Sequence, residues 1–146
     1  MEVLRKLVSQ DKHITSFIQE IQSGLTASQL ITGLTGSARP VLVDALFNYI
    51  QKPIYIVSPN LLQAQKMVDE LVGLLGEEHV HYYPADEFIA ADLSVASPEL
   101  RAERIATLDC LARGEKAVYI IPVAGLRKIM PPKEHWLQYF FTDSYW

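Results

Sequence analysis

Short apolar runs alternate with amphipathic segments along most of this chain, and the alternation restricts the folds that it can form. Runs rich in β-branched and other apolar residues predict strands at 29–34, 53–58, 80–83 and 116–121. Helical spacing of apolar residues, with capping residues at the ends, predicts helices at 1–22, 40–50, 61–75, 98–113 and 123–130. Apolar strands that alternate with helices are typical of a parallel sheet covered on both faces. We therefore predict an α/β fold with a parallel sheet flanked by helices.

The composition limits the class of protein further. The chain has 146 residues, the size of one domain, and its 49% hydrophobic and 21% charged residues are an ordinary globular balance. No apolar run reaches the roughly 18 residues of a membrane helix, and no secretory signal is present, so we expect a cytoplasmic protein with no membrane partner. The one cysteine, Cys110, excludes an internal disulfide. A net charge of −4 disfavours a domain whose main task is to grip nucleic acid.

The segment after the first predicted strand lies where phosphate-binding loops lie, between a strand and a helix. The phosphate-loop pattern is G-x-x-x-x-G-K-[ST], and this chain has GLTGSARP at 33–40. Glycine is kept at the first position and stands again inside the segment. We define the altered phosphate loop by Gly33, Thr35, Gly36, Ser37, Ala38, Arg39 and Pro40.

The three positions that complete the pattern are all changed. Ala38 replaces the second glycine, and its Cβ costs about 1–2 kcal/mol if the position needs a positive φ. Arg39 keeps the charge of the lysine but not its compact ammonium group. Pro40 has neither the hydroxyl that ligates Mg²⁺ nor an N–H for a phosphate. We expect no nucleotide binding here; the competing interpretation is a strand-to-helix turn that matches the pattern by chance.

Three further segments, taken in order, resemble a known family. They are IYIVSPN at 54–60, ASPELRAER at 96–104 and VYIIPV at 118–123. The first looks like a conserved segment of helicase motor domains. The whole series resembles the N-terminal module of the bacterial transcription-repair coupling factors (Mfd), which is itself similar to the helicase-like protein UvrB. The likeness covers essentially the whole chain, although the 84–97 segment is too short for the DNA-clamping hairpin of UvrB.

This resemblance implies a RecA-like domain, derived from an ATP-driven motor, that has no catalytic residue, cofactor or metal of its own. In the family, the parent acts on stalled RNA polymerase and on DNA with ATP and Mg²⁺ in separate motor domains, and the N-terminal module recruits UvrA. Residues 1–135 would then form the motor-type subdomain, and 136–146 would begin a UvrA-binding subdomain that is mostly absent. Another class stays open, a small nucleotide-binding enzyme with an altered phosphate loop.

Candidate partner contacts lie on one helix and near the end of the sequence. Arg101 and Arg104 stand one helical turn apart and could bind a phosphate or an acidic partner, or else pair with acidic residues of their own helix. Trp136 begins an aromatic run that holds six of the 14 aromatic residues. We interpret that run as the start of the next subdomain; the alternative is a last strand that packs on the core.

Two other patterns are weaker signs of a catalytic or metal site. Asp86 and Glu87 resemble the acidic box of a motor ATPase, but they do not end an apolar strand, and we predict a surface loop. His79 and His81 are predicted on one face of a short strand without a third well-placed ligand, so we expect no metal site there.

The remaining reactive or charged groups favour structural roles. Cys110 lies in the middle of a predicted helix and is expected to be a packed free thiol. Arg127, Lys128 and Lys133 form a basic cluster that is too small to indicate DNA binding.

Overall fold

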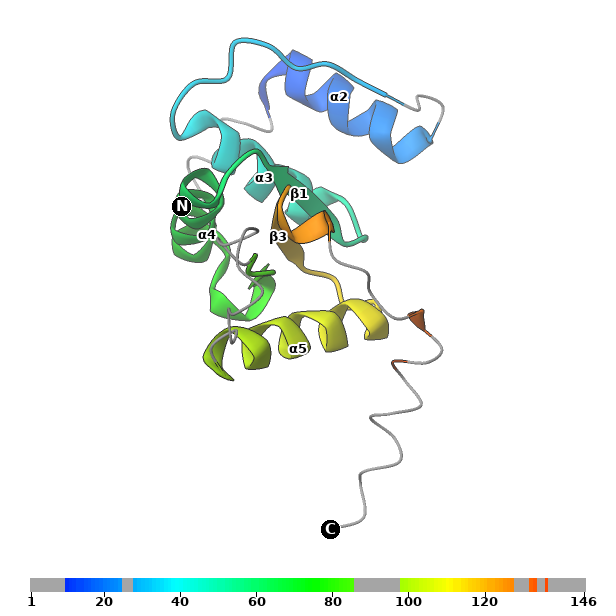
Figure 1. Ribbon diagram of the computed structural model, residues 1–146. Helices are drawn as coiled ribbons and strands as arrows, with labels where there is room; N and C mark the ends of the chain where they lie inside the picture. Colours follow the sequence, from blue (N-terminus) through cyan, green and yellow to red (C-terminus); the bar gives the residue numbers. More distant parts are fainter. Residues whose placement is uncertain (1–9, 25–27, 86–97, 128–131, 134–135, 137–146) are drawn as a thin grey trace.

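The computed structural model describes residues 10–24, 28–85, 98–127, 132–133 and 136, and helices surround a small sheet in it (Figure 1). The helices are α2 (Lys12–Ser23), α3 (Ala38–Tyr49), α4 (Leu61–Leu75) and α5 (Pro98–Arg113). The strands are β1 (Ile54–Ser58), β2 (Val80–Tyr82) and β3 (Val118–Pro122). Two 3₁₀ turns, η1 (Glu77–His79) and η2 (Gly125–Arg127), lie beside β2 and β3.

The three strands form a parallel sheet in the order β1-β3-β2. Ile54 of β1 and Val80 of β2 both align with Val118 of β3, so the pairing of all three strands begins at the same level. Every residue of the central strand β3 is buried. This arrangement confirms the predicted α/β class and its parallel sheet.

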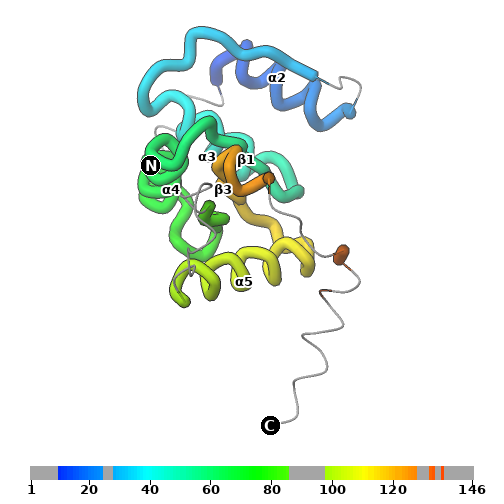
Figure 2. Tube along the Cα trace, in the orientation of Figure 1, coloured from blue at the N-terminus to red at the C-terminus, as the bar shows by residue number. Residues whose placement is uncertain are grey.

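The predicted strand at 29–34 is wrong, because these residues form an irregular segment. Leu30 is 89% exposed, and Gln29 donates a hydrogen bond of 2.9 Å from Nε2 to Glu20 Oε2 of α2. Figure 2 shows the segment running back along α2, at the far end of the molecule from α5. A short apolar run does not by itself distinguish a strand from other structure, and none of the three strands pairs with this segment.

The predicted boundaries of the other elements are mostly confirmed. Helix α4 has the predicted bounds; the Asn60 side chain accepts from the Gln63 N–H at 2.8 Å, and Gly76 follows the last turn. The predicted helix at 1–22 is interrupted, because Asp11 is extended and caps α2 through the N–H groups of His13 and Ile14. In 123–130 a 3₁₀ turn over Gly125–Arg127 replaces the predicted helix, and residues 128–130 lie outside the described residues. Ser97, which directly precedes α5, also lies outside them.

The main core lies between one face of the sheet and helices α3 and α4. It is built from Phe47, Ala64, Leu71, Val80, Val118 and Ile120. Side chains alternate between the faces of a strand, so Tyr119 and Ile121 of β3 face the other way. Thr107 of α5 donates from Oγ1 to the Tyr82 carbonyl at 2.8 Å, which ties α5 to β2.

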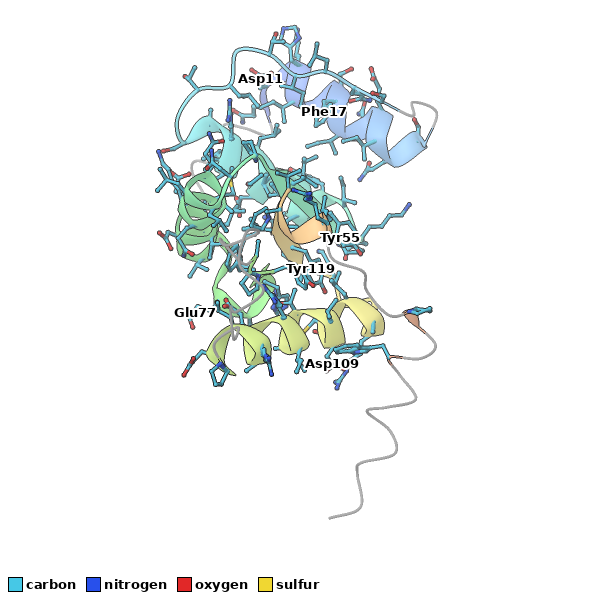
Figure 3. The ribbon with its side chains drawn as sticks, viewed as in Figure 1. Asp11, Phe17, Tyr55, Glu77, Asp109 and Tyr119 are labelled. Atoms are coloured by element: carbon cyan, nitrogen blue, oxygen red, sulfur yellow. The ribbon has the colours of Figure 1, made fainter. Side chains whose placement is uncertain are left out.

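The second face is only partly covered within the described part of the chain. Tyr119 has no exposed surface and lies between Tyr55 and His81, with ring centroids 5.5 and 5.3 Å away. Tyr55 and Val57 of β1 are each 55% exposed, and Figure 3 shows Tyr55 beside Tyr119. Among the described helices, none is long and apolar enough to cross a membrane.

Leu71→Ala should lower the free energy of unfolding by about 2–5 kcal/mol, because Leu71 has no exposed surface and its loss leaves a cavity in the core. The matched control is Leu62→Ala on the same helix, where Leu62 is 81% exposed and the change should stay within about 0.5 kcal/mol. Urea denaturation followed by circular dichroism measures both. Equal losses at the two positions would contradict this packing of α4.

Candidate functional site

The altered phosphate loop leads directly into the N-terminus of α3, as predicted. Gly33 and Gly36 have positive φ angles of 84° and 53°, which lets the backbone turn twice before the helix. The Ala38 N–H donates to the Thr35 carbonyl at 3.1 Å, and the helix begins at Ala38. The loop therefore has the position of a phosphate loop but follows an irregular segment rather than a strand.

Two positions of the altered phosphate loop cannot offer a backbone N–H group to an anion. A phosphate loop depends on such groups together with the helix dipole. Here the Ala38 N–H is used in the turn, and the Val41 N–H donates to the Ser37 carbonyl at 3.2 Å. Pro40 has no N–H, and the Ser37 side chain makes no capping hydrogen bond within the described residues. Two positions of the loop, Ala38 and Pro40, therefore have no backbone donor available to a phosphate.

The three substituted positions behave differently in the structure. Ala38 lies within α3, and no described residue other than glycine has a positive φ. Position 38 therefore does not need a positive φ, and the Cβ of Ala38 causes no strain there. Arg39 is exposed to solvent. Pro40 is fully buried in the first turn of α3, where a helix tolerates proline because the first N–H groups have no partner within the helix. Pro40 therefore fits the helix start and offers neither a hydroxyl nor an N–H to a ligand.

The two arginines of α5 have different environments. The Arg104 Nε group donates to the Pro84 carbonyl at 2.7 Å, so Arg104 holds the segment after β2 against α5. Arg101 is exposed. Asp109, one of the acidic residues expected near them, forms an ion pair of 2.7 Å with Arg113 instead. Of the two, Arg101 has the accessible side chain that a partner contact needs.

The residues near the end of the described chain form no extended basic or aromatic site. The Trp136 N–H donates to the Pro132 carbonyl at 3.0 Å, and Trp136 is half-buried. Arg127 and Lys133 are exposed, while Lys128 lies outside the described residues. Asp86 and Glu87 also lie outside them, as does the aromatic run after Trp136.

The two histidines do not share one strand face, which corrects the prediction. His79 belongs to η1, and its ring packs on Phe47 with centroids 5.2 Å apart. His81 belongs to β2 and packs on Tyr119. Side chains alternate between two faces only within a strand, and His79 lies in the 3₁₀ turn that precedes β2. A two-residue spacing therefore does not place the two histidine rings on one face.

The structure instead brings His81 near Cys110 and Glu115, a grouping that sequence analysis missed. Burial lowers the pKa of His81 and raises the pKa of the Cys110 thiol, which the Glu115 carboxylate raises further. Burial also raises the pKa of Tyr119 to about 12. No local motif signals this group, because 29 positions separate His81 from Cys110 and only the β2–α5 packing brings them together.

The fold defines the chain as an α/β domain with a small parallel sheet, and its loop before α3 differs from the phosphate-loop pattern at three positions. The chain is 40% identical over 136 residues to the transcription-repair-coupling factor of Bacillus subtilis (strain 168), which covers 93% of this chain. It is 31% identical over 142 residues, 97% of its length, to the proteins of that name in Staphylococcus aureus strains USA300 and MRSA252. No family model matches the chain.

These relatives are much longer than this chain, which spans 12% of each of them. The chain is therefore homologous to a segment of the transcription-repair-coupling factors. To this extent the resemblance inferred from the motifs is confirmed.

Gly36→Ala should lower the free energy of unfolding by about 1 kcal/mol, because its positive φ strains any L side chain although the Cβ meets no atom within 4 Å. Gly73→Ala is the matched control: Gly73 lies inside α4 with equal open space, and the change should stabilise by up to about 1 kcal/mol. Thermal unfolding of both variants measures the difference. A stabilised Gly36→Ala variant would contradict the loop conformation.

Proposed function

We propose that this chain is part of a transcription-repair-coupling factor and acts there as a non-catalytic scaffold module in transcription-coupled nucleotide excision repair. The observation that carries the proposal is the altered loop. Arg39 and Pro40 stand where the phosphate-loop pattern has lysine and a hydroxyl, the Ala38 N–H is bonded within the turn, and Pro40 has no N–H. A RecA-like ancestry that has lost its motor chemistry accounts for a loop kept in place without its ligands.

The proposed module acts by protein contacts and helps recruit UvrA to stalled RNA polymerase. ATP and Mg²⁺ would act in other parts of the parent, which also contact RNA polymerase and DNA. The net charge of −4 supports this division, because a domain that grips DNA by itself is usually basic. The module would work in the cytoplasm, where a free thiol such as Cys110 stays reduced.

The uncovered part of the sheet supports a role in a larger assembly. Tyr55 and Val57 project from β1, each about half exposed, beside the buried Tyr119. Exposed apolar residues that adjoin a core are typical of surfaces that contact another protein or domain. The half-buried Trp136 and the exposed Arg101 are the proposed contacts outside this patch.

Isothermal titration calorimetry of the chain with Mg-ATP should show no measurable binding, and an assay of phosphate release should show no hydrolysis. The physical reason is the loss of the lysine, the hydroxyl and the amide donors at the loop. Micromolar affinity for Mg-ATP would contradict the scaffold role and favour the alternative, a small nucleotide-binding enzyme.

The triple variant Ala38→Gly, Arg39→Lys, Pro40→Thr should restore at best weak nucleotide binding. It returns three side chains of the pattern but leaves 29–34 outside the sheet, so the loop is still not anchored by a strand. The control is Arg39→Lys alone, which should bind no better than the parent chain. Tight nucleotide binding by the triple variant would mean that the three side chains alone explain why the parent chain does not bind.

A pull-down should show that this chain alone retains UvrA poorly, while a version of the parent extended by about 100 residues, the size of an added domain, retains it well. A stable interface needs about 800 Å² on each partner. Apart from the patch of exposed Tyr55 and Val57 on β1, the described residues offer no cluster of aromatic and arginine side chains to anchor one. Tyr55→Ser in the extended version serves as the control for that patch.

Equal UvrA retention by the two lengths would place the binding surface within the present chain and contradict this assignment. Loss of UvrA retention in the Tyr55→Ser variant would also contradict it, because UvrA would then bind at the exposed face of the sheet around Tyr55.

A further inference from the structure

Three metal-ligating side chains meet where α5 packs on the edge of the sheet, at a place distinct from the altered loop. His81 of β2, Cys110 of α5 and Glu115 just after α5 each present one ligand atom, and these atoms all lie within 4.8 Å of one another. His81 and Cys110 are half-buried, and Glu115 is exposed. The cluster therefore opens to solvent on one side and is backed by the protein on the other.

The end of α5 fixes two of the three ligands relative to each other. Gly114 has a φ of 72°, the Gly114 N–H donates to the Leu111 carbonyl at 3.1 Å, and the Glu115 N–H donates to the Cys110 carbonyl at 3.2 Å. These two bonds are those of a Schellman motif, in which the chain folds back over the last helical turn. The motif brings Glu115 beside Cys110, and a hydrogen bond between their side chains contributes to the raised pKa of the thiol.

One ring nitrogen of the third ligand, His81, is buried and makes no hydrogen bond within the described residues. Its Nε2 atom is shielded from solvent and has no hydrogen-bond partner within the described part of the chain. A buried polar atom without a partner costs free energy and calls for an explanation. Stacking on Tyr119 holds the ring in place, and burial lowers the pKa of His81 so that the imidazole is neutral and able to ligate.

We propose that His81, Cys110 and Glu115 form a binding site for a zinc ion. Imidazole, thiolate and carboxylate are the three protein ligand types of zinc, whereas Mg²⁺ and Ca²⁺ select oxygen ligands. As the zinc–sulfur bond forms, the Cys110 thiol releases its proton to the solvent. Three protein ligands leave the fourth tetrahedral position to a water molecule on the open side of the cluster.

The cluster needs only a small rearrangement to close around the ion. Zinc bonds of about 2.0–2.3 Å in a tetrahedron place the ligand atoms roughly 3.3–3.8 Å apart, and the three ligand atoms here lie within 4.8 Å of one another. A movement of at most about 1.5 Å suffices. The exposed Glu115 side chain has the most room to move, because His81 and Cys110 belong to a strand and a helix.

Titration of the 146-residue chain with Co²⁺, a spectroscopic substitute for zinc, tests the site directly. We expect one equivalent of Co²⁺ to give a sulfur-to-cobalt charge-transfer band and the visible bands of a tetrahedral complex. One equivalent of Zn²⁺ should then displace it. If millimolar Co²⁺ produces no charge-transfer band, the proposal is wrong.

Variants identify the ligands. Cys110→Ser should abolish the charge-transfer band, and His81→Gln and Glu115→Gln should each weaken binding by at least about tenfold, since loss of an outer partner alone costs about 10–100-fold. His79→Gln is the matched control, because it removes the neighbouring imidazole that packs on Phe47 instead; it should leave the affinity unchanged.

Circular dichroism of each metal-free variant checks its fold, and His81→Gln carries the test if Cys110→Ser unfolds. A charge-transfer band that survives unchanged in both His81→Gln and Glu115→Gln would overturn the proposal, because Cys110 would then bind the metal without the cluster.

Discussion

Strand β3 pairs in parallel with β1 along one edge and with β2 along the other, and all five of its residues are buried. Parallel strands need crossover connections, and here these are helices α4 and α5, which the pairing brings onto the sheet. Val118 and Ile120 build the main core with α3 and α4, while Tyr119 builds a second contact layer with His81. β3 is therefore the strand against which both contact layers pack.

The elements that sequence analysis predicted best are those whose signals are local. The apolar run of β1 and the capping pair of α4, Asn60 and Gly76, specify their structures within a few residues. The segment at 29–34 also carries an apolar run, yet whether such a run pairs as a strand depends on its contacts with the rest of the fold. That is a tertiary property, and an irregular path along α2 with a hydrogen bond to Glu20 is the outcome. The break at Asp11 was available locally, because aspartate is a strong N-cap residue.

The candidate sites divide in the same way. The position of the altered loop before α3 could be predicted, because glycines and a proline near a helix start have local meanings. The contact of Arg104 with the Pro84 carbonyl and the meeting of His81 with Cys110 could not, since both depend on how α5 packs against β2. The Schellman end of α5 has a partly local signal, because Gly114 directly follows the predicted helix at 98–113 and glycine is common just past a helix end.

The altered loop differs from a phosphate loop in its backbone surroundings as well as in its side chains. In a phosphate loop the preceding strand holds the first glycine at the edge of the sheet, so that successive amides converge on the anion. Here Gly33 follows a segment held by α2 rather than by β3, and the amides of Ala38 and Val41 are bonded within the turn and helix. A lysine and a hydroxyl at positions 39 and 40 would therefore supply two side chains of the pattern without the strand that anchors such a loop. Pro40 is instead buried in the first turn of α3, and Phe47 of the same helix packs in the core.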